Sequence, residues 1–364
     1  MAGYAKLDKQ RLLYRENLER CAEGRRNGTN MTTPLFTRRQ VLAFGAALVP
    51  EFAFAKALDK RQLSLILAPS NLGLRPEKNG DQPGAWRAPE VLIAAGLRGR
   101  LGADKVVALD RPTYDFDEQA GTRIRNGYAI RRFSLELGQT VSSAISQGLF
   151  PIVIGGDCSV LLGCLYGARM AHSRGLVHID GHSDFFHPGN YDTQGALGAV
   201  AGMDLAFATG RGEVLLAEWP GVDGPLSRDE DTIQIGERNA LDANFSYSDM
   251  VHTKITRLII QEVLRTGVPA AAKTALERMD APGLERAWMF VDLDVLDESV
   301  MPAVDSPGTP GLGFGQLSSL MGALLESRRF LGACITIYDP ARDPKTVYAG
   351  KIVTTLEDAF EHVR

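Results

Sequence analysis

Residues 176–184 read Leu-Val-His-Ile-Asp-Gly-His-Ser-Asp, an apolar run followed by side chains that can bind metal. The apolar run that ends at Ile179 is typical of a short, buried β-strand. Asp180, His182 and Asp184 follow at alternate positions, so an extended backbone points these three side chains to one side. In open α/β sheets, ligands bind beyond the carboxyl ends of the strands. The stretch therefore predicts a strand that leads directly into a binding site.

Further apolar runs on both sides of this stretch predict more strands of the same kind. Helical stretches at Ala129–Ser146 and Ile255–Leu264 lie between some of them. Continuous apolar strands that alternate with helices indicate an α/β protein with a mostly parallel sheet covered on both faces. We predict strands at Leu63–Leu67, Lys105–Leu109, Pro151–Ile154, Leu176–Ile179, Thr232–Ile235, Trp288–Leu293 and Ala333–Tyr338.

Two more of these predicted strands end in residues that can bind metal. Residues 154–159 read Ile-Gly-Gly-Asp-Cys-Ser, where the two glycines permit a tight turn and Cys158 stands at the mouth of the strand. Residues 290–297 read Phe-Val-Asp-Leu-Asp-Val-Leu-Asp, and Asp292 and Asp294 share one face at the strand end. Three strand ends therefore offer ligand-type side chains to the same edge of the sheet.

Carboxylates that converge at one edge repel one another and need a cation to remain ionised. An oxygen-rich site with one imidazole suits Mn²⁺ or a similar ion, and two ions about 3.5–4 Å apart can activate water and polarise a substrate. A single Asp-x-Asp pair is also typical of a loop cap, but the three strand ends together favour a site for two divalent ions. Asp157 is expected to pin backbone N–H groups of its turn instead of binding metal.

The three segments resemble the signatures of the ureohydrolases, the arginase and agmatinase superfamily, which read Gly-Gly-Asp-His-Ser, Asp-Ala-His-x-Asp and Ser-x-Asp-x-Asp-x-x-Asp-Pro. The resemblance runs from about residue 62 to the C-terminus and includes Ile235–Arg238 and Gly308–Pro310. It implies a three-layer α/β/α sandwich, two Mn²⁺ ions, a small guanidino or amidine substrate whose C–N bond is hydrolysed, and a homo-trimer or hexamer. The metal ligands that it implies are Cys158, Asp180, His182, Asp184, Asp292 and Asp294.

Asp184 is the residue that we expect to serve catalysis as well as metal binding. Its carboxylate would accept a hydrogen bond from the attacking water and aim it at the substrate. The other ligands would hold the ions that lower the pKa of that water.

Cys158 departs from the family pattern, because it stands where the ureohydrolases usually have a metal-binding histidine. A thiolate can bind metal, and binding would deprotonate it. It is also softer than imidazole, so metal preference can shift away from Mn²⁺. We expect Cys158 to be a ligand; the alternative is one lost ion and a buried, inert thiol.

Two more departures concern the substrate. Ala201 occupies the place of the family's proton-shuttling histidine, and Ile337 that of the glutamate that holds the guanidinium in arginase. His187 is the nearby histidine that could replace the first, although a surface loop position is its alternative. Asp339 is the acid closest to the second, and a turn before Pro340 is its alternative. Plain arginine is therefore not the expected substrate.

Composition argues for small-molecule chemistry. The 364 residues carry 40 Lys and Arg against 44 Asp and Glu, a formal net charge of −4, which gives no electrostatic basis for binding nucleic acid or a membrane surface. The four cysteines lack a Cys-x-x-Cys pair, so neither a disulfide framework nor a zinc ribbon is indicated. Cys164 and Cys334 are expected to be small, buried, apolar residues.

The N-terminal segment precedes the predicted catalytic domain at 62–364. Residues 1–30 form a polar extension that is not translated if Met31 is the true start. Residues 31–55 combine Arg38-Arg39, an apolar run and Ala53-Phe54-Ala55, which together are typical of a twin-arginine export signal. The run is too short to remain as a membrane span. We expect export, for example to the periplasm; an amphipathic helix with an accidental arginine pair in a cytoplasmic protein is the alternative.

Three functions are compatible with these residues. The first is a binuclear-metal-dependent hydrolase of C–N bonds in linear amidines. The second is a non-catalytic binding or regulatory subunit with the same fold, which the absence of the family's histidine and glutamate favours. The third is a deacetylase-like hydrolase, which normally uses a single zinc ion. Metal content separates the three.

Overall fold

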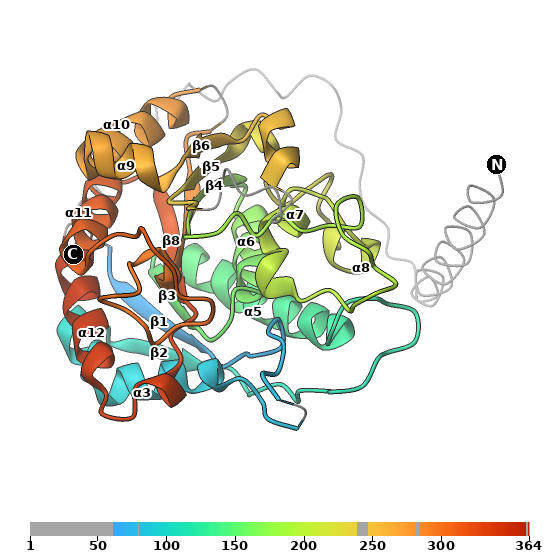
Figure 1. The fold of residues 1–364 in the computed structure, drawn as a ribbon. Helices are drawn as coiled ribbons and strands as arrows, with labels where there is room; N and C mark the ends of the chain where they lie inside the picture. Colours follow the sequence, from blue (N-terminus) through green and yellow to red (C-terminus); the bar gives the residue numbers. More distant parts are fainter. Residues whose placement is uncertain (1–60, 79, 239–246, 282–283, 362, 364) are drawn as a thin grey trace, which may run out of the picture. The chain divides into compact units, whose positions relative to one another are not determined.

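A parallel β-sheet of eight strands forms the centre of the described part of the fold (Figure 1). This computed structural model describes residues 61–78, 80–238, 247–281, 284–361 and 363. The strand order is β2-β1-β3-β8-β7-β4-β5-β6, and every neighbouring pair is parallel. The strands are β1 Leu63–Ala68, β2 Lys105–Ala108, β3 Phe150–Gly155, β4 Gly175–Ile179, β5 Thr232–Ile235, β6 Thr256–Leu258, β7 Ala287–Asp292 and β8 Phe330–Thr336.

All seven predicted strands are present, with ends that differ by a few residues at most. The prediction of a helix over Ile255–Leu264 is wrong at its start, because Thr256–Leu258 forms the edge strand β6 and α9 begins only at Ile260. β6 forms only three register pairs with β5, too few to produce an alternating pattern that distinguishes it from the helix that follows.

Helices pack on both faces of the sheet, which confirms the three-layer α/β/α sandwich (Figure 1). One layer consists of α5 Gly127–Ser146, α6 Val160–Met170, α7 Asp204–Ala208 and α8 Val214–Ala217. The other layer consists of α3 Ala88–Ala94, α4 Leu97–Leu101, α9 Ile260–Thr266, α10 Val268–Met279, α11 Phe314–Leu325 and α12 Val347–Phe360. The predicted helix at Ala129–Ser146 corresponds to α5.

The apolar core lies along the middle of the sheet. Every residue of β3, β4, β5, β7 and β8 is buried, as expected for parallel strands with helices on both faces. The edge strand β2, in contrast, is largely exposed. Cys164 on α6 and Cys334 on β8 are fully buried, as predicted.

The predictions for residues 1–30 and 31–55 lie outside the described residues. The described residues belong to one compact unit of the chain. None of the described helices is long and apolar enough to cross a membrane.

Candidate metal centre

The carboxyl ends of three central strands bring the predicted ligands together. Cys158 follows β3, Asp180 and the two ligands after it follow β4, and Asp292 ends β7; β8 lies between β3 and β7. The thiol of Cys158 donates to Asp292 Oδ2 at 2.9 Å, and His182 Nδ1 lies 2.8 Å from Asp294 Oδ2. Among the residues that the structure describes, potential ligand atoms within 4.8 Å of one another occur in three groups, which are Cys158–Asp184–Asp204, His178–Asp180–Asp184 and Asp180–His182–Asp294.

The turn after β3 is held by close backbone packing and by Asp157. A Cβ atom at Gly156 would lie 1.8 Å from the carbonyl oxygen of Ser70, so only glycine fits there. Asp157 accepts hydrogen bonds from the Ser159 and Gly73 amides and from the Ser70 hydroxyl. This is the backbone-pinning role predicted for Asp157, and it sets the position of Cys158.

The turn after β4 is held by side chains from β5 and its following loop. Gln234 Nε2 donates to the carbonyl oxygens of Asp180 and His182 at 3.2 and 3.0 Å. The Arg238 guanidinium lies so close to Gly181 that a Cβ atom there would be 2.2 Å from Nη1. The same guanidinium donates to the backbone carbonyl of Asp294, which ties the β4 and β7 ends together.

Burial and neighbouring charges shift the pKa values of the acids and the histidine in the cluster. Burial, followed by neighbouring carboxylates, raises the pKa values of Asp180 and Asp184 well above their usual range. Burial alone would lower the pKa of His182, but Asp294 and Asp180 raise it to about 9. For Asp294, burial alone would raise the pKa, but the positive charges of His182 and Arg238 hold it below its usual range. Asp180 and Asp184 thus retain protons unless a cation compensates them, whereas Asp294 is already compensated by His182 and Arg238.

Divalent cations fit this donor set. Asp180 Oδ2 is buried and has no hydrogen-bond partner among the described residues. Asp292 and Asp294 orient their other oxygens through backbone amides, since Asp294 N donates to Asp292 Oδ1 and Gly181 N to Asp294 Oδ1. The carboxylates, one imidazole and one thiol gathered at these strand ends form a set of ligands suited to two divalent ions. The six predicted ligands would hold those ions.

A cavity of about 610 Å³ opens onto the cluster. Cys158, His182, Asp184 and Asp294 line it, whereas Asp180 and Asp292 are not among its lining residues. Asp184 is 8% exposed and has a left-handed φ of 46°, a conformation that aspartate tolerates better than most residues. The predicted catalytic acid therefore faces the space in which a substrate would bind.

Ala201 and Ile337 also line this cavity, as their sequence positions imply. Ala201 lies in a short 3₁₀ turn, η2 Val200–Gly202, and its amide donates to the Gly73 carbonyl. Ile337 follows β8 with a φ of 73°, which is strained for a β-branched residue. The cavity wall at these two places is apolar and offers neither a proton nor a negative charge.

The two predicted substrate residues lie outside the lining of this cavity. His187 Nε2 is 3.1 Å from Asp249 Oδ2, and its Nδ1 accepts from the Gly189 amide. Asp339 accepts from the Ala341 amide and lines an adjoining cavity of about 330 Å³. The geometry matches the alternatives considered for both, a loop histidine and a turn aspartate, and their substrate roles stay predictions.

Two buried residues beside the cluster were not among the predicted site residues. His178 precedes Asp180 by two positions on β4, and Asp204 opens α7; both are fully buried. The signal for His178 was present, because a residue two positions before a ligand on a strand points to the same side. Asp204 gave no such signal, since only tertiary folding brings it to the strand ends.

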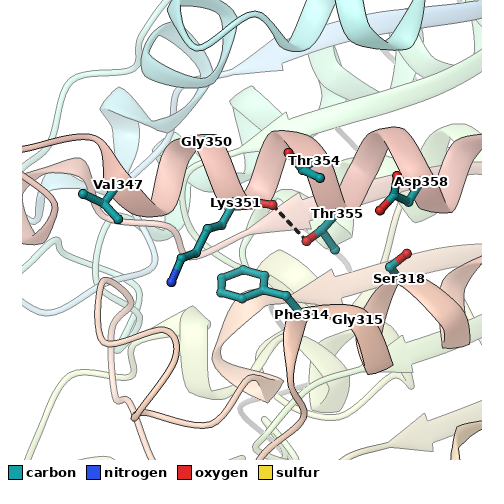
Figure 2. Close-up of a pocket in the computed structure, with 9 residues that line it drawn as sticks. All are labelled: Phe314, Gly315, Ser318, Val347, Gly350, Lys351, Thr354, Thr355 and Asp358. Carbon is teal, nitrogen blue, oxygen red and sulfur yellow. Dashed lines mark hydrogen bonds between the residues drawn. The ribbon is translucent and has the colours of Figure 1, made fainter.

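A separate groove of about 600 Å³ lies between α11 and α12 (Figure 2). Lys351 lies 5.6 Å from the centre of the Phe314 ring, and the Thr355 hydroxyl donates to the Lys351 carbonyl. Asp358 is the one acid among its lining residues, so the groove has no donor set comparable with the metal centre.

We predict that the metal-free protein becomes less stable as pH rises. Burial raises the folded-state pKa of Asp204 to about 6, and that of His182 is about 9. The pKa values of these two groups in the unfolded state are about 3.9 and about 6.5. The folded state therefore binds more protons than the unfolded state. It loses stability as pH rises from about 3.9 to about 6 for Asp204 and from about 6.5 to about 9 for His182. Thermal unfolding midpoints of chelator-treated protein should fall from about pH 5 to about pH 9.

Metal-loaded protein is the control for this experiment, and it should lack this decline because bound cations compensate the carboxylates. A midpoint of the chelated protein that increases with pH over the same range would contradict the assignment.

A second prediction concerns Cys158. Burial, followed by Asp292, raises the pKa of the thiol, so only a bound cation would hold it as a thiolate. Cys158→Ala should lower metal occupancy, and Cys158→His should retain or improve Mn²⁺ binding. Cys164→Ala, which alters another fully buried cysteine, is the matched control. Metal analysis of the purified variants checks this, and unchanged occupancy in Cys158→Ala would exclude the cysteine as a ligand.

Known proteins resemble this chain in family signature, in sequence and in solved structure. The family model described as the Arginase family matches residues 62–356. An arginase of Bacillus caldovelox is 28% identical over 248 residues, covering 67% of this chain and 79% of the relative. An arginase of Bacillus subtilis is 25% identical over 305 residues, covering 83% and 98%. The crystal structure of arginase from Bacillus cereus aligns with a TM-score of 0.71 at 25% identity, covering 83% and 98%.

The family match covers most of the chain, and it spans all three strand ends that form the candidate metal centre. The chain therefore belongs to the arginase family.

Proposed function

We propose that this protein hydrolyses a C–N bond in a linear amidine, with two Mn²⁺ or similar divalent ions at the strand ends. The observation that carries the proposal is the convergence of ligand-type side chains from β3, β4 and β7 on one cavity. A binding subunit would not require so many buried, mutually repelling acids, because each of them costs stability without a cation.

Two bound divalent ions would lower the pKa of a water molecule towards neutrality and polarise the reacting carbon. The chain's own residues would do the rest. Asp184, the acid that faces the cavity, would accept a hydrogen bond from the attacking water and direct its lone pair at the substrate. Arg238 and Gln234 would keep the two ligand turns in place throughout.

The part of the cavity wall formed by Ile337 and Ala201 favours a substrate that is neutral at its reacting group. Ile337 cannot pair with a guanidinium, and an unpaired buried cation costs several kcal/mol. Ala201 cannot donate a proton to a leaving amine, and loss of a positioned general acid typically costs about 10²–10⁴-fold. An N-hydroxyguanidine meets both conditions: it is less basic than a guanidine, and water can displace hydroxylamine, which is itself weakly basic.

Steady-state kinetics on matched substrates test the proposal. The protein is loaded with Mn²⁺, its metal content is measured, and release of urea, ammonia or hydroxylamine is followed for arginine, agmatine, formimidoyl compounds and N-hydroxyguanidines. We expect turnover of at least one less basic amidine and poor turnover of arginine. Efficient hydrolysis of arginine would overturn the account of the cavity wall. No turnover of any amidine with both ions bound would support the non-catalytic alternative.

A further inference from the structure

Asp204 is a buried acid that lies beside the predicted metal ligands. It opens α7 and is fully buried. Neither of its carboxylate oxygens has a hydrogen-bond partner among the described residues. His178 Nε2 lies 3.4 Å from Oδ1, and both nitrogens of that ring also lack a hydrogen-bond partner in the described part of the chain. Buried polar groups in folded proteins are normally satisfied, so this pair requires an explanation.

Asp157 shows what a structural acid looks like in the same protein. It is equally buried and lies only one residue from Cys158. Its carboxylate accepts three hydrogen bonds, two from backbone amides and one from a hydroxyl. Asp204 does nothing comparable for the backbone. Protonation would not resolve the difference, because a neutral carboxyl would still have an unsatisfied O–H group.

The surroundings of Asp204 identify the missing partner as a cation. One of its carboxylate oxygens lies within 4.8 Å of both Cys158 Sγ and a carboxylate oxygen of Asp184. Two buried carboxylates so close together repel each other unless a positive charge lies between them.

His178 links Asp204 to the other side of the centre. Its Nε2 atom lies 3.4 Å from Asp204 Oδ1 and 3.7 Å from Asp180 Oδ2. Its ring stacks on Phe290 with centroids 4.6 Å apart, so the ring plane is fixed by packing. With its proton on Nε2, the imidazole faces two carboxylates at once. A side chain that donates a hydrogen bond to a metal-binding carboxylate fixes the orientation of that carboxylate.

We propose that Asp204 is a further ligand of the ion on the Cys158 side, and that His178 is the positioning residue for Asp204 and Asp180. The inference rests on the metal centre of the proposed function but not on amidine hydrolysis. A carboxylate beside the thiol gives this ion an additional hard oxygen donor, which favours Mn²⁺ over the softer metals that a thiolate prefers.

The test is a calorimetric titration of metal-free protein with Mn²⁺, combined with the absorption spectrum of the Co²⁺-loaded form. Asp204→Asn should weaken one of the two binding events by at least about 10–100-fold, the range seen when groups around a metal site are lost. It should also change the Co²⁺ ligand-field spectrum, since one oxygen donor is lost. Asp231→Asn is the matched control, because Asp231 is a buried acid paired with Arg174 at the opposite ends of the strands.

His178 variants separate positioning from simple packing. His178→Gln keeps an N–H donor and should retain most of the Mn²⁺ affinity, whereas His178→Leu removes the donor and should lower it. Both variants remove the imidazole ring that stacks on Phe290, so loss of packing alone would lower the Mn²⁺ affinity of the two variants equally.

Several outcomes would overturn the proposal. Unaltered affinities and an unaltered Co²⁺ spectrum in Asp204→Asn would exclude Asp204 as a ligand. Asp204→Ala serves as a second variant if the asparagine variant does not fold, and unaltered binding in it has the same meaning. Equal losses in the two His178 variants would exclude the positioning role. Amidine turnover plays no part in these measurements, so a failure of the proposed reaction would remain distinguishable from a failure of this ligand assignment.

Discussion

Asp292→Asn should remove at least one ion from the metal centre and lower hydrolysis by about 10³-fold or more. The Asp292 carboxylate accepts from the Cys158 thiol through one oxygen and from the Asp294 amide through the other. It therefore lies between the Cys158 side and the His182 side of the cluster. An amide in its place removes a negative charge shared by both, and metal ions typically stabilise the transition state by several kcal/mol. About 4 kcal/mol corresponds to about 10³-fold in rate.

Metal analysis after gel filtration and amidine turnover measure the two effects. Asp231→Asn again provides the matched control, because this buried acid is paired with Arg174 away from the cavity. The control should keep full metal content and activity. If Asp292→Asn kept both ions and its activity, the binuclear centre would not be where we place it.

Ala201→His should raise turnover of substrates that have a basic leaving amine by about 10²–10⁴-fold, the usual contribution of a positioned general acid. Ala201 faces the cavity from η2, with its backbone held by the Gly73 carbonyl. It is only partly buried, so a larger side chain can extend into the cavity. An imidazole there could donate a proton to the departing nitrogen.

Ala199→His is the control for this gain, since Ala199 lines the same cavity two residues earlier. Comparing amines with hydroxylamine as leaving groups shows whether proton donation is responsible. The gain should be large for amines and small for hydroxylamine. An equal gain for both, or the same gain in Ala199→His, would show that the histidine acts in some other way.

The strands were predictable because strands in the interior of a protein appear in the sequence as short apolar runs. β3, β4, β5, β7 and β8 are buried on both faces and consist mainly of apolar residues. The gathering of ligand-type side chains at these strand ends was predictable for a related reason, since acids immediately after such strands have no role in the core. β6 was missed because a three-residue edge strand merges with the apolar residues of the helix after it.

The parts of the site that escaped prediction depend on contacts between distant segments. Asp204 is 20 residues beyond Asp184 along the chain, and nothing around it distinguishes a ligand from a helix-capping acid. His187 illustrates the opposite case, because its ring turns to Asp249 rather than to the cavity. Loop residues take their direction from tertiary contacts, which local sequence patterns do not encode.

The position of β8 has a consequence for how the protein is made. Phe330–Thr336 is the last strand to leave the ribosome, yet it inserts between β3 and β7 and hydrogen-bonds to both. A nascent chain that lacks it has Cys158 on one side of a gap and Asp292 on the other. The metal-binding geometry can therefore form only after translation of β8 is complete, and premature termination before residue 330 yields a chain that cannot assemble the centre.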